Sequence, residues 1–396
     1  RSTPLYSSAA SDVYKRQILS LMLTNCTNND DKLKARANEL AQKFIITDGH
    51  IDLPWRLHKN GYEDISVRTP GGDFDYVRAK QGGLDAPFMS IYVPATYQVT
   101  GGAKEMALEL MNSVKRITTD HPDKFEMAYS ISDVERIFNE GKIALPMGME
   151  NGAPIEGDLD NIQFFFDEGI RYITLTHSED NDICDSSYNL GERTHKGLSD
   201  FGKEVVLEMN RVGIMVDISH VSDDAFYQIM DVTQVPAIAS HSSARHFTPG
   251  FERNMSDDMI KRLAENGGVI QINFGSSFVT QESQDKRKKN SEDVSAFAKE
   301  NNLESDDPRV KEFAKKVAID NPVFCDVTDV ADHFDHVVKL VGIDHVAFGS
   351  DYDGVGDTLP YGLKDASTFP NPVSYTHLRA HETPEHLVCR RLLEKK

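Results

Sequence analysis

The sequence predicts an α/β fold of the (β/α)8 TIM-like barrel type over residues 32–373. Eight short runs rich in apolar and β-branched residues alternate with helix-like segments along the chain. The runs are nearly continuously apolar, as expected for parallel strands that are buried on both faces. The rival fold is a doubly wound open sheet, but the glycine-rich phosphate loop typical of that fold is absent from the sequence.

The expected strands are, in chain order, Phe44–Asp52, Pro87–Ala95, Ile143–Glu150, Tyr172–His177, Ile214–His220, Val235–His241, Gly268–Phe274 and His345–Asp351. A helix over Lys32–Lys43 precedes the first strand. Further helices are expected from apolar residues at spacings of three and four, at Ala103–Ile117, Asp160–Glu168, Ser199–Arg211, Asp223–Met230, Ser256–Glu265 and Val327–Val341. Serine residues stand at helix N-cap positions: Ser199, Ser222 and Ser256.

One charged segment, Gly275–Pro322, is too long for a simple connection. We expect it to be partly helical and to form either a lid or a solvated excursion from the barrel.

Composition and charge narrow the function classes. Hydrophobic residues make up 39% and charged residues 27% of the chain, which is typical of a soluble globular protein. The formal net charge of -20 argues against a nucleic-acid or anionic-membrane partner. The cysteines are widely spaced and form no Cys-x-x-Cys pair, which argues against a cysteine zinc site. A Cys184–Cys325 disulfide in an oxidising compartment is left open.

Both ends of the chain differ in pattern from the rest. Residues 1–17 and 374–396 resemble translated sequencing-adapter sequence, so we expect them to be non-native and the barrel to be truncated at its C-terminal side. Residues 18–31 resemble the end of a bacterial lipoprotein signal and its polar tether, with Leu23 three residues before Cys26. The expectation is a lipid anchor on Cys26 and a place in the cell envelope, periplasmic or at the surface. An ordinary apolar turn in a cytoplasmic protein is the alternative.

Histidines and carboxylates stand at the ends of six of the expected strands. The C-terminal ends of all barrel strands converge on one face, so these side chains should lie close together. In His50-Ile51-Asp52, the first and third side chains point to the same side of an extended strand. The set comprises His50, Asp52, Glu150, His177, His220, His241 and Asp351.

Core packing is a poor explanation for such a set, because charged groups are rarely buried unless they are paired or bound to metal. Nitrogen and oxygen ligands without thiolate suit Zn²⁺ or a similar divalent ion. A catalytic zinc takes three protein ligands, so five ligands predict two metals that share one carboxylate: His50, Asp52, Glu150, His220 and His241. Two such metals can hold a bridging hydroxide and polarise a carbonyl group.

Six motifs follow one another in order: D-G-H-I-D, G-x-E-N-G, T-L-T-H, D-I-S-H, A-S-H-S-S and F-G-S-D-Y-D-G. In this order and spacing they resemble the membrane (renal) dipeptidase family of zinc peptidases, from about residue 44 to about residue 370. The resemblance implies a dinuclear zinc dipeptidase that hydrolyses dipeptides by attack of a metal-bridging hydroxide. It also suggests a homodimer, which the missing C-terminus leaves open.

The resemblance implies a ligand role for five residues. His50, Asp52 and Glu150 would hold one zinc. Glu150 would bridge to the second zinc, which His220 and His241 complete.

The resemblance also implies roles in substrate binding and catalysis. His177 would polarise the substrate carbonyl or its oxyanion. Arg253 would clamp the C-terminal carboxylate of the dipeptide, since a planar guanidinium fits a carboxylate with two hydrogen bonds. Arg245 is the alternative for that clamp. Asp351 would handle the bridging water and the free amino group, and would pass a proton to the leaving amine.

Two other interpretations stay open. The same centre suits another amidohydrolase-type hydrolase, such as a lactonase or deaminase, and the truncated chain could be an inactive fragment. Asp48 and Asp217 are interpreted as support or turn residues of the site. The remaining histidines on expected loops and helices are interpreted as structural or surface residues: His195, His246, His333, His336 and His345.

Overall fold

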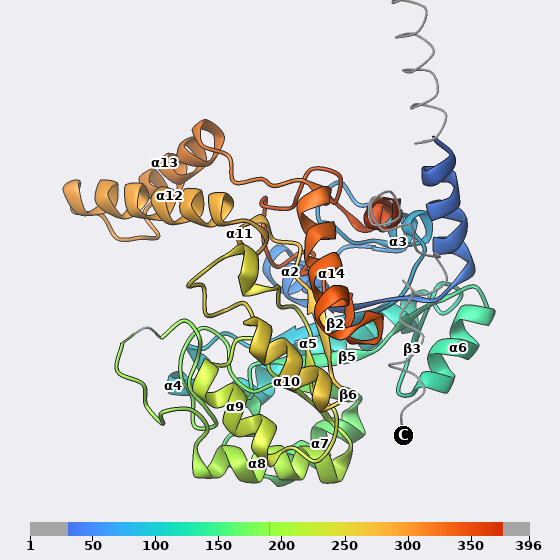
Figure 1. Cartoon of the computed structure of the whole chain (residues 1–396), viewed down its shortest axis with the longest axis horizontal. Coiled ribbons are helices and arrows are strands. Elements are labelled where there is room, and N and C mark those ends of the chain that lie inside the picture. The colour runs from blue at the N-terminus through green and yellow to red at the C-terminus, as the bar shows by residue number, and fades with distance from the viewer. Residues whose placement is uncertain (1–30, 190, 375–396) are drawn as a thin grey trace, which may run out of the picture.

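The computed structural model describes residues 31–189 and 191–374, and its central element is a closed barrel of parallel strands with helices around it (Figure 1). Within these residues the barrel order is β1-β10-β9-β8-β7-β6-β5-β2. Each barrel strand overlaps an expected strand, which confirms the predicted fold class. The strands are Ile46–Ile51 (β1), Leu84–Tyr92 (β2), Met147–Glu150 (β5), Ile170–Thr174 (β6), Met215–Asp217 (β7), Ile238–Ala239 (β8), Val269–Ile272 (β9) and Val346–Phe348 (β10).

The helices follow the expected periodicity closely. Residues 31–43 are helical, and Ala37 and Leu40 of this helix pack against Val373. The serine side chains at the three expected N-caps each accept a backbone N–H from three residues further on. The other helices are Leu53–Asn60 (α2), Tyr76–Gly82 (α3), Tyr97–Thr100 (α4), Ala103–Asp120 (α5), Ile131–Asn139 (α6), Asp160–Glu168 (α7), Asp200–Val212 (α8), Asp223–Val232 (α9), Asp257–Glu265 (α10), Ser276–Val279 (α11), Gln281–Glu300 (α12), Pro308–Asp320 (α13) and Val327–Val341 (α14).

The expected strand Ile143–Glu150 consists of two strands in two sheets. Its first part, β4 (Ile143–Leu145), pairs in parallel with β3 (Phe125–Met127) outside the barrel, whereas its second part is β5. Pro146 separates them, and proline has no N–H to donate to a strand ladder. The expectation of one continuous strand is therefore wrong at this point.

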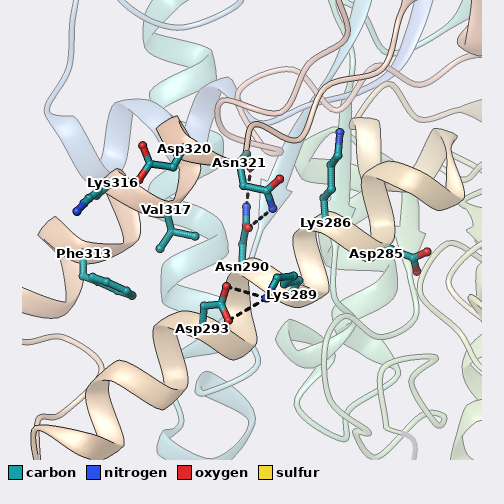
Figure 2. Close-up of a pocket in the computed structure, with 10 residues that line it drawn as sticks. All are labelled: Asp285, Lys286, Lys289, Asn290, Asp293, Phe313, Lys316, Val317, Asp320 and Asn321. Carbon is teal, nitrogen blue, oxygen red and sulfur yellow. Dashed lines mark hydrogen bonds and ion pairs between the residues drawn. The ribbon is translucent and has the colours of Figure 1, made fainter.

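The long segment Gly275–Pro322 contains α11, α12 and α13. Helices α12 and α13 lie side by side and extend away from the barrel (Figure 1). The rings of Phe297 and Phe313 stack with centroids 4.2 Å apart. In the groove of about 520 Å³ between the helices, Asn290 Nδ2 donates to the Asn321 carbonyl at 3.0 Å and Asn321 Nδ2 donates to Asn290 Oδ1 at 2.6 Å (Figure 2). Ser283 is the only buried residue of α12, so helices α12 and α13 fit the expected solvated excursion.

Three further observations concern the expectations for the ends and the cysteines. No helix in the described part of the chain combines the length and apolar character needed to cross a bilayer. Cys184 and Cys325 are both buried and free, so the disulfide that the sequence left open is not formed. Residues 1–17, Cys26 and residues 375–396 lie outside the described residues.

Candidate metal centre and active site

The C-terminal ends of the barrel strands bring all five expected metal ligands together. His50 lies at the end of β1, and Glu150 is the last residue of β5. Asp52, His241 and His220 follow the ends of β1, β8 and β7 by one, two and three residues. All five are buried. Residues that are far apart in the sequence thus meet on the face where a barrel carries its chemistry.

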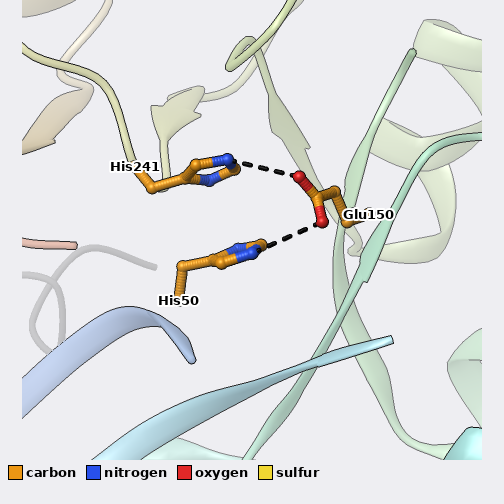
Figure 3. Close-up of side chains that lie close together, drawn as sticks. All are labelled: His50, Glu150 and His241. Atoms are coloured by element: carbon orange, nitrogen blue, oxygen red, sulfur yellow. Dashed lines mark ion pairs between the residues drawn. The ribbon is translucent and has the colours of Figure 1, made fainter. Parts of the chain in front are cut away.

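Glu150 stands between the imidazole groups. Its Oε2 lies 3.5 Å from His50 Nε2, and its Oε1 lies 3.0 Å from His220 Nε2 and 3.3 Å from His241 Nε2. Figure 3 shows His50 and His241 facing the two different oxygens of this carboxylate. Burial raises the pKa of Glu150, but the surrounding imidazoles of His50 and His177 outweigh it and hold the pKa well below its usual range. Each oxygen of the ionised carboxylate faces a different set of ligands, which is the geometry of a bridge.

The hydrogen bonds of His50 define which of its nitrogens can bind a cation. The Tyr172 hydroxyl donates to the Gly49 carbonyl at 3.0 Å, so it accepts a hydrogen bond from His50 Nδ1 at 3.0 Å. Nδ1 therefore carries a proton, and in the neutral ring the lone pair is on Nε2. Burial lowers the pKa of His50, but Tyr172, Glu150 and Asp52 together raise it well above its usual range. That Nε2 is buried and has no hydrogen-bond partner among the described residues, as is also true of Asp52 Oδ1. Asp52 Oδ2 lies 3.5 Å from the same Nε2.

A serine hydroxyl and a carboxylate orient the His241 ring, as the Tyr172 hydroxyl orients His50. Ser240 Oγ donates to Asp217 Oδ2 at 2.6 Å and accepts from His241 Nδ1 at 2.7 Å. The lone pair of His241 is therefore on Nε2, which points at Glu150 and lies 2.8 Å from His220 Nε2. Carboxylate or hydroxyl partners on the far nitrogen are typical of histidines that bind metal.

With the His50 and His241 rings neutral, as metal binding requires, their lone pairs converge on the negative charge of Glu150. His50 Nε2, His241 Nε2 and the Glu150 carboxylate are acceptors, and acceptors in a buried site repel one another unless a cation lies between them. The groups His50–Glu150–His241, His50–Asp52–Asp351 and Glu150–His177–His220 each place three ligand atoms within 4.8 Å of one another. Nitrogen and oxygen donors of this kind fit a divalent metal.

The backbone around the site is held in an uncommon conformation. His220 has φ 71° and Asp351 has φ 61°, both in the left-handed region that side chains other than glycine rarely adopt. Such residues persist where the surroundings enforce them, and they cluster at active sites. Gly354 is required for close approach, because a Cβ there would lie 2.1 Å from Asp52 Oδ2 and 2.3 Å from Asp351 Oδ1.

His177 and Asp351 belong to different groups of neighbouring ligand atoms, His177 with Glu150 and His220, and Asp351 with His50 and Asp52. His177 Nε2 lies 3.6 Å from Glu150 Oε1, and its ring contacts Tyr92 with centroids 4.8 Å apart. Burial lowers the pKa of His177, so its imidazole is neutral at neutral pH. Asp351 Oδ2 accepts a hydrogen bond from Asn273 Nδ2 at 2.7 Å. Burial raises the pKa of Asp351 above its ordinary value.

Of the two candidate arginines, Arg245 has a hydrogen-bond partner on each of its three guanidinium nitrogens. It donates to both oxygens of Asp223, at 2.7 and 2.6 Å, and to the carbonyls of Asn254 and Glu252. Arg253 is buried, with Nη1 donating to Ser242 Oγ at 2.7 Å and Nη2 to the His241 carbonyl at 2.9 Å. Its Nε has no partner among the described residues. Arg253 is thus the arginine whose Nε is left as a donor beside the expected metal ligands.

Several supporting residues were not identified from the sequence. Tyr172, Ser240 and Asn273 resemble ordinary strand residues, and only the barrel shows that they reach site residues. Asp48 and Asp217 were interpreted as support or turn residues, and the structure shows how they act. Asp48 Oδ1 accepts the backbone N–H groups of His50 and Ser350, and burial raises its pKa to about 6. Asp217 Oδ1 accepts those of Ser219 and Ser240.

Comparison with known families gives one match over most of the chain. The sequence model described as membrane dipeptidase (peptidase family M19) matches residues 34–384. Dipeptidase 3 of Mus musculus is 30% identical over 349 residues, which is 86% of this chain and 61% of the mouse protein. The chain therefore spans less than two thirds of that relative. An uncharacterized dipeptidase of Schizosaccharomyces pombe, C965.12, is 28% identical over 382 residues, covering 92% of this chain and 82% of the yeast protein.

Solved structures share the fold. The probable dipeptidase PvdM from Pseudomonas aeruginosa superimposes with a TM-score of 0.75 at 25% identity, over 89% of this chain and 94% of that one. A metallo peptidase from Rhodobacter sphaeroides, liganded with a phosphinate mimic of the dipeptide L-Ala-D-Ala, gives a TM-score of 0.71 at 23% identity, over 88% and 97%.

Proposed function

Since this chain belongs to the membrane dipeptidase family, peptidase family M19, we propose that it is a dinuclear zinc dipeptidase. The observation that carries the proposal is the position of Glu150, whose two oxygens face different histidines at 3.0–3.5 Å. His50, Asp52 and Glu150 would hold one ion, and Glu150, His220 and His241 the other. The metal pair would supply an activated water at neutral pH and polarisation of the scissile carbonyl.

Arg253 recognises the carboxylate end of the substrate in this proposal. Its buried guanidinium keeps a free Nε donor, and a buried cation gains most from a bound carboxylate because little water competes. The phosphinate mimic of a dipeptide in the Rhodobacter sphaeroides relative supports a ligand of this size. A carboxylate clamp favours free dipeptides over lactones and nucleobases, which lack that group.

His177 and Asp351 complete the reaction. The neutral His177 imidazole stabilises the negative charge that develops on the carbonyl oxygen. Asp351 takes up a proton and delivers it to the leaving amine, a role that suits a carboxyl group whose burial raises its pKa. Asn273 holds the Asp351 side chain in place through the 2.7 Å hydrogen bond.

Metal removal and substrate choice test the proposal together. A chelator should abolish dipeptide hydrolysis, and added zinc should restore it. In a panel of dipeptides, lactones and aminopurines, only the dipeptides should be cleaved. Full activity of the metal-stripped protein would reject the proposal, and turnover of lactones or nucleobases instead would identify a different amidohydrolase. Loss of all hydrolysis despite bound zinc would identify an inactive fragment.

Glu150→Ala tests the bridge. Because both ions share Glu150, the Glu150→Ala variant should lose both of them. Asp52→Ala should mainly weaken the binding of one ion. Elemental analysis after dialysis measures the difference. Two zinc ions retained by Glu150→Ala would contradict the bridging role.

A lipid anchor at Cys26, a place in the cell envelope and a homodimer remain proposals. Mass spectrometry of the full-length gene product should find a diacylglyceryl group on Cys26, and a free thiol there would reject the anchor. Light scattering of the same product should give twice the chain mass.

A further inference from the structure

A second group of metal-binding side chains lies outside the active site. We call it the lateral cluster, and it consists of His246, Asp257 and His336. His246 belongs to the short 3-10 helix Arg245–Phe247, Asp257 is the first residue of α10, and His336 lies in α14. One ligand atom from each residue lies within 4.8 Å of the others. None of the three contributes to the chemistry proposed above.

The contacts within the lateral cluster already bring its donors together. His336 Nε2 lies 2.8 Å from Asp257 Oδ1. The rings of His246 and His336 stack, with centroids 4.3 Å apart and planes inclined by 20°. His246 is exposed and Asp257 and His336 are half-buried, so an ion can reach all three from solvent.

We propose that the lateral cluster binds a divalent transition-metal ion of the zinc class. Two imidazoles and one carboxylate are a ligand set that suits zinc, cobalt or nickel, and three protein ligands leave a position for water. Two stacked rings cannot both direct a nitrogen lone pair at one ion, because each lone pair lies in its ring plane. Binding therefore requires the His246 ring to turn, which its exposure permits.

Two of the three ligands stand on well-fixed helices. The Ser256 side chain caps α10 by accepting the Met259 N–H, which fixes the turn that carries Asp257. In α14, one turn before His336, the His333 ring accepts the Ala244 N–H at Nδ1 (3.1 Å) and donates from Nε2 to the Val279 carbonyl (2.9 Å). Helix α14 is thereby attached to the segment that carries His246. Ligands fixed in this way lose little freedom on binding, which favours affinity.

Metal binding at the lateral cluster affects the chain segment that lies between two of its ligands. His246 and Asp257 flank the segment 247–256, which contains the buried Arg253. An ion bound to both would close this segment into a short loop tied to α14. The lateral cluster is thus a metal-dependent clasp for the segment that carries Arg253, and binding to the folded state should raise its thermal stability.

Zinc titration of the full chain with its active site already loaded tests the clasp. The wild type should bind one more ion per chain than His246→Ala or His336→Gln, measured by equilibrium dialysis and elemental analysis. Excess zinc should raise the melting temperature of the wild type but not of these variants. His58→Ala is the matched control, since His58 also pairs with a carboxylate, Glu109, at 2.9 Å but belongs to no three-ligand group among the described residues. It should behave as the wild type does.

The same measurement in Glu150→Ala separates this inference from the proposed function. That variant should keep the ion of the lateral cluster, and adding His246→Ala should remove it. Cobalt in place of zinc should give a visible absorption band in Glu150→Ala that disappears in the double variant. Equal metal content and equal melting shifts in the wild type and His246→Ala would overturn the proposal, whatever the active site contains.

Discussion

Replacing Tyr172 by phenylalanine isolates the contribution of one hydroxyl group to the metal centre. This hydroxyl accepts the Nδ1 proton of His50 at 3.0 Å and donates to the Gly49 carbonyl at 3.0 Å. The Tyr172 hydroxyl, the His50 ring and the Gly49 carbonyl lie inside the barrel, and Tyr172 is fully buried. Its ring crosses directly over Gly148, where a Cβ would come within 2.0 Å of it. Phenylalanine keeps the ring in this position and removes only the hydroxyl.

The expected magnitudes follow from these contacts. Two buried polar groups lose their partner, and each costs about 1–3 kcal/mol, so the free energy of unfolding of the metal-free protein should fall by about 2–6 kcal/mol. Without the Tyr172 hydroxyl, His50 can also turn or change tautomer. Loss of such a support typically weakens metal binding by about 10–100-fold, which corresponds to about 1.4–2.7 kcal/mol.

Urea unfolding of the metal-free protein and competition with a zinc-binding dye measure the two effects separately. Tyr352→Phe is the matched control, because the Tyr352 hydroxyl is equally buried but donates to the Asp365 carbonyl at 3.0 Å, away from the ligands. This control should lose stability and keep its zinc affinity. Unchanged zinc affinity in Tyr172→Phe, or an equal loss in both variants, would refute the assigned role of Tyr172.

Three further predictions concern substrate binding, pH and close packing. Arg253→Lys, which loses the planar guanidinium, should raise KM for dipeptides by about tenfold or more with a smaller effect on kcat; the same rise with dipeptide amides would exclude a carboxylate clamp. Burial raises the pKa of Asp85 to about 7, so between about pH 4 and pH 7 the native state keeps a proton that the unfolded state has lost. Asp85 should therefore lower the free energy of unfolding as pH rises through this range, by up to about 4 kcal/mol. Urea unfolding should show a smaller fall in Asp85→Asn than in the wild type, because Asp48 and Asp73, whose pKa values burial raises to about 6 and about 7, keep their share of the fall. Gly354→Ala should displace the Asp52 and Asp351 carboxylates and lower kcat by about 100-fold, with an unchanged circular dichroism spectrum. A normal kcat would show that the backbone at residue 354 can shift without displacing these carboxylates.

The fold was largely predictable because parallel barrel strands carry a strong local signal, namely continuous apolar runs that end in polar residues. The errors arose where one residue overrides that signal. Ile143–Glu150 is apolar throughout its first seven residues, yet Pro146 divides it between two sheets. The long excursion was predictable only in outline, because α12 has little apolar periodicity and a single buried residue, Ser283.

The candidate site was predictable to the extent that its residues have distinctive chemistry. Histidines and carboxylates at strand ends can be recognised individually, and the barrel brings them together. Their supports cannot be recognised in this way. Tyr172 is an aromatic residue in an apolar strand, and it contacts His50 across a sequence separation of 122 positions. The choice between Arg245 and Arg253 likewise required the structure, because only their partners distinguish them.

The closure of the barrel between β1 and β10 has a consequence for the order of events during biosynthesis. Asp48 in β1 binds the backbone of Ser350, 302 positions later in the chain, and Asp351 donates its N–H to the His50 carbonyl. Contacts of such high sequence separation form late, since the entropy of closing the loop must be lost before they form. His50 and Asp52 therefore leave the ribosome long before the strand that fixes them exists. In the proposed two-metal centre, correct metal uptake would consequently be a step of maturation that follows translation of nearly the whole barrel.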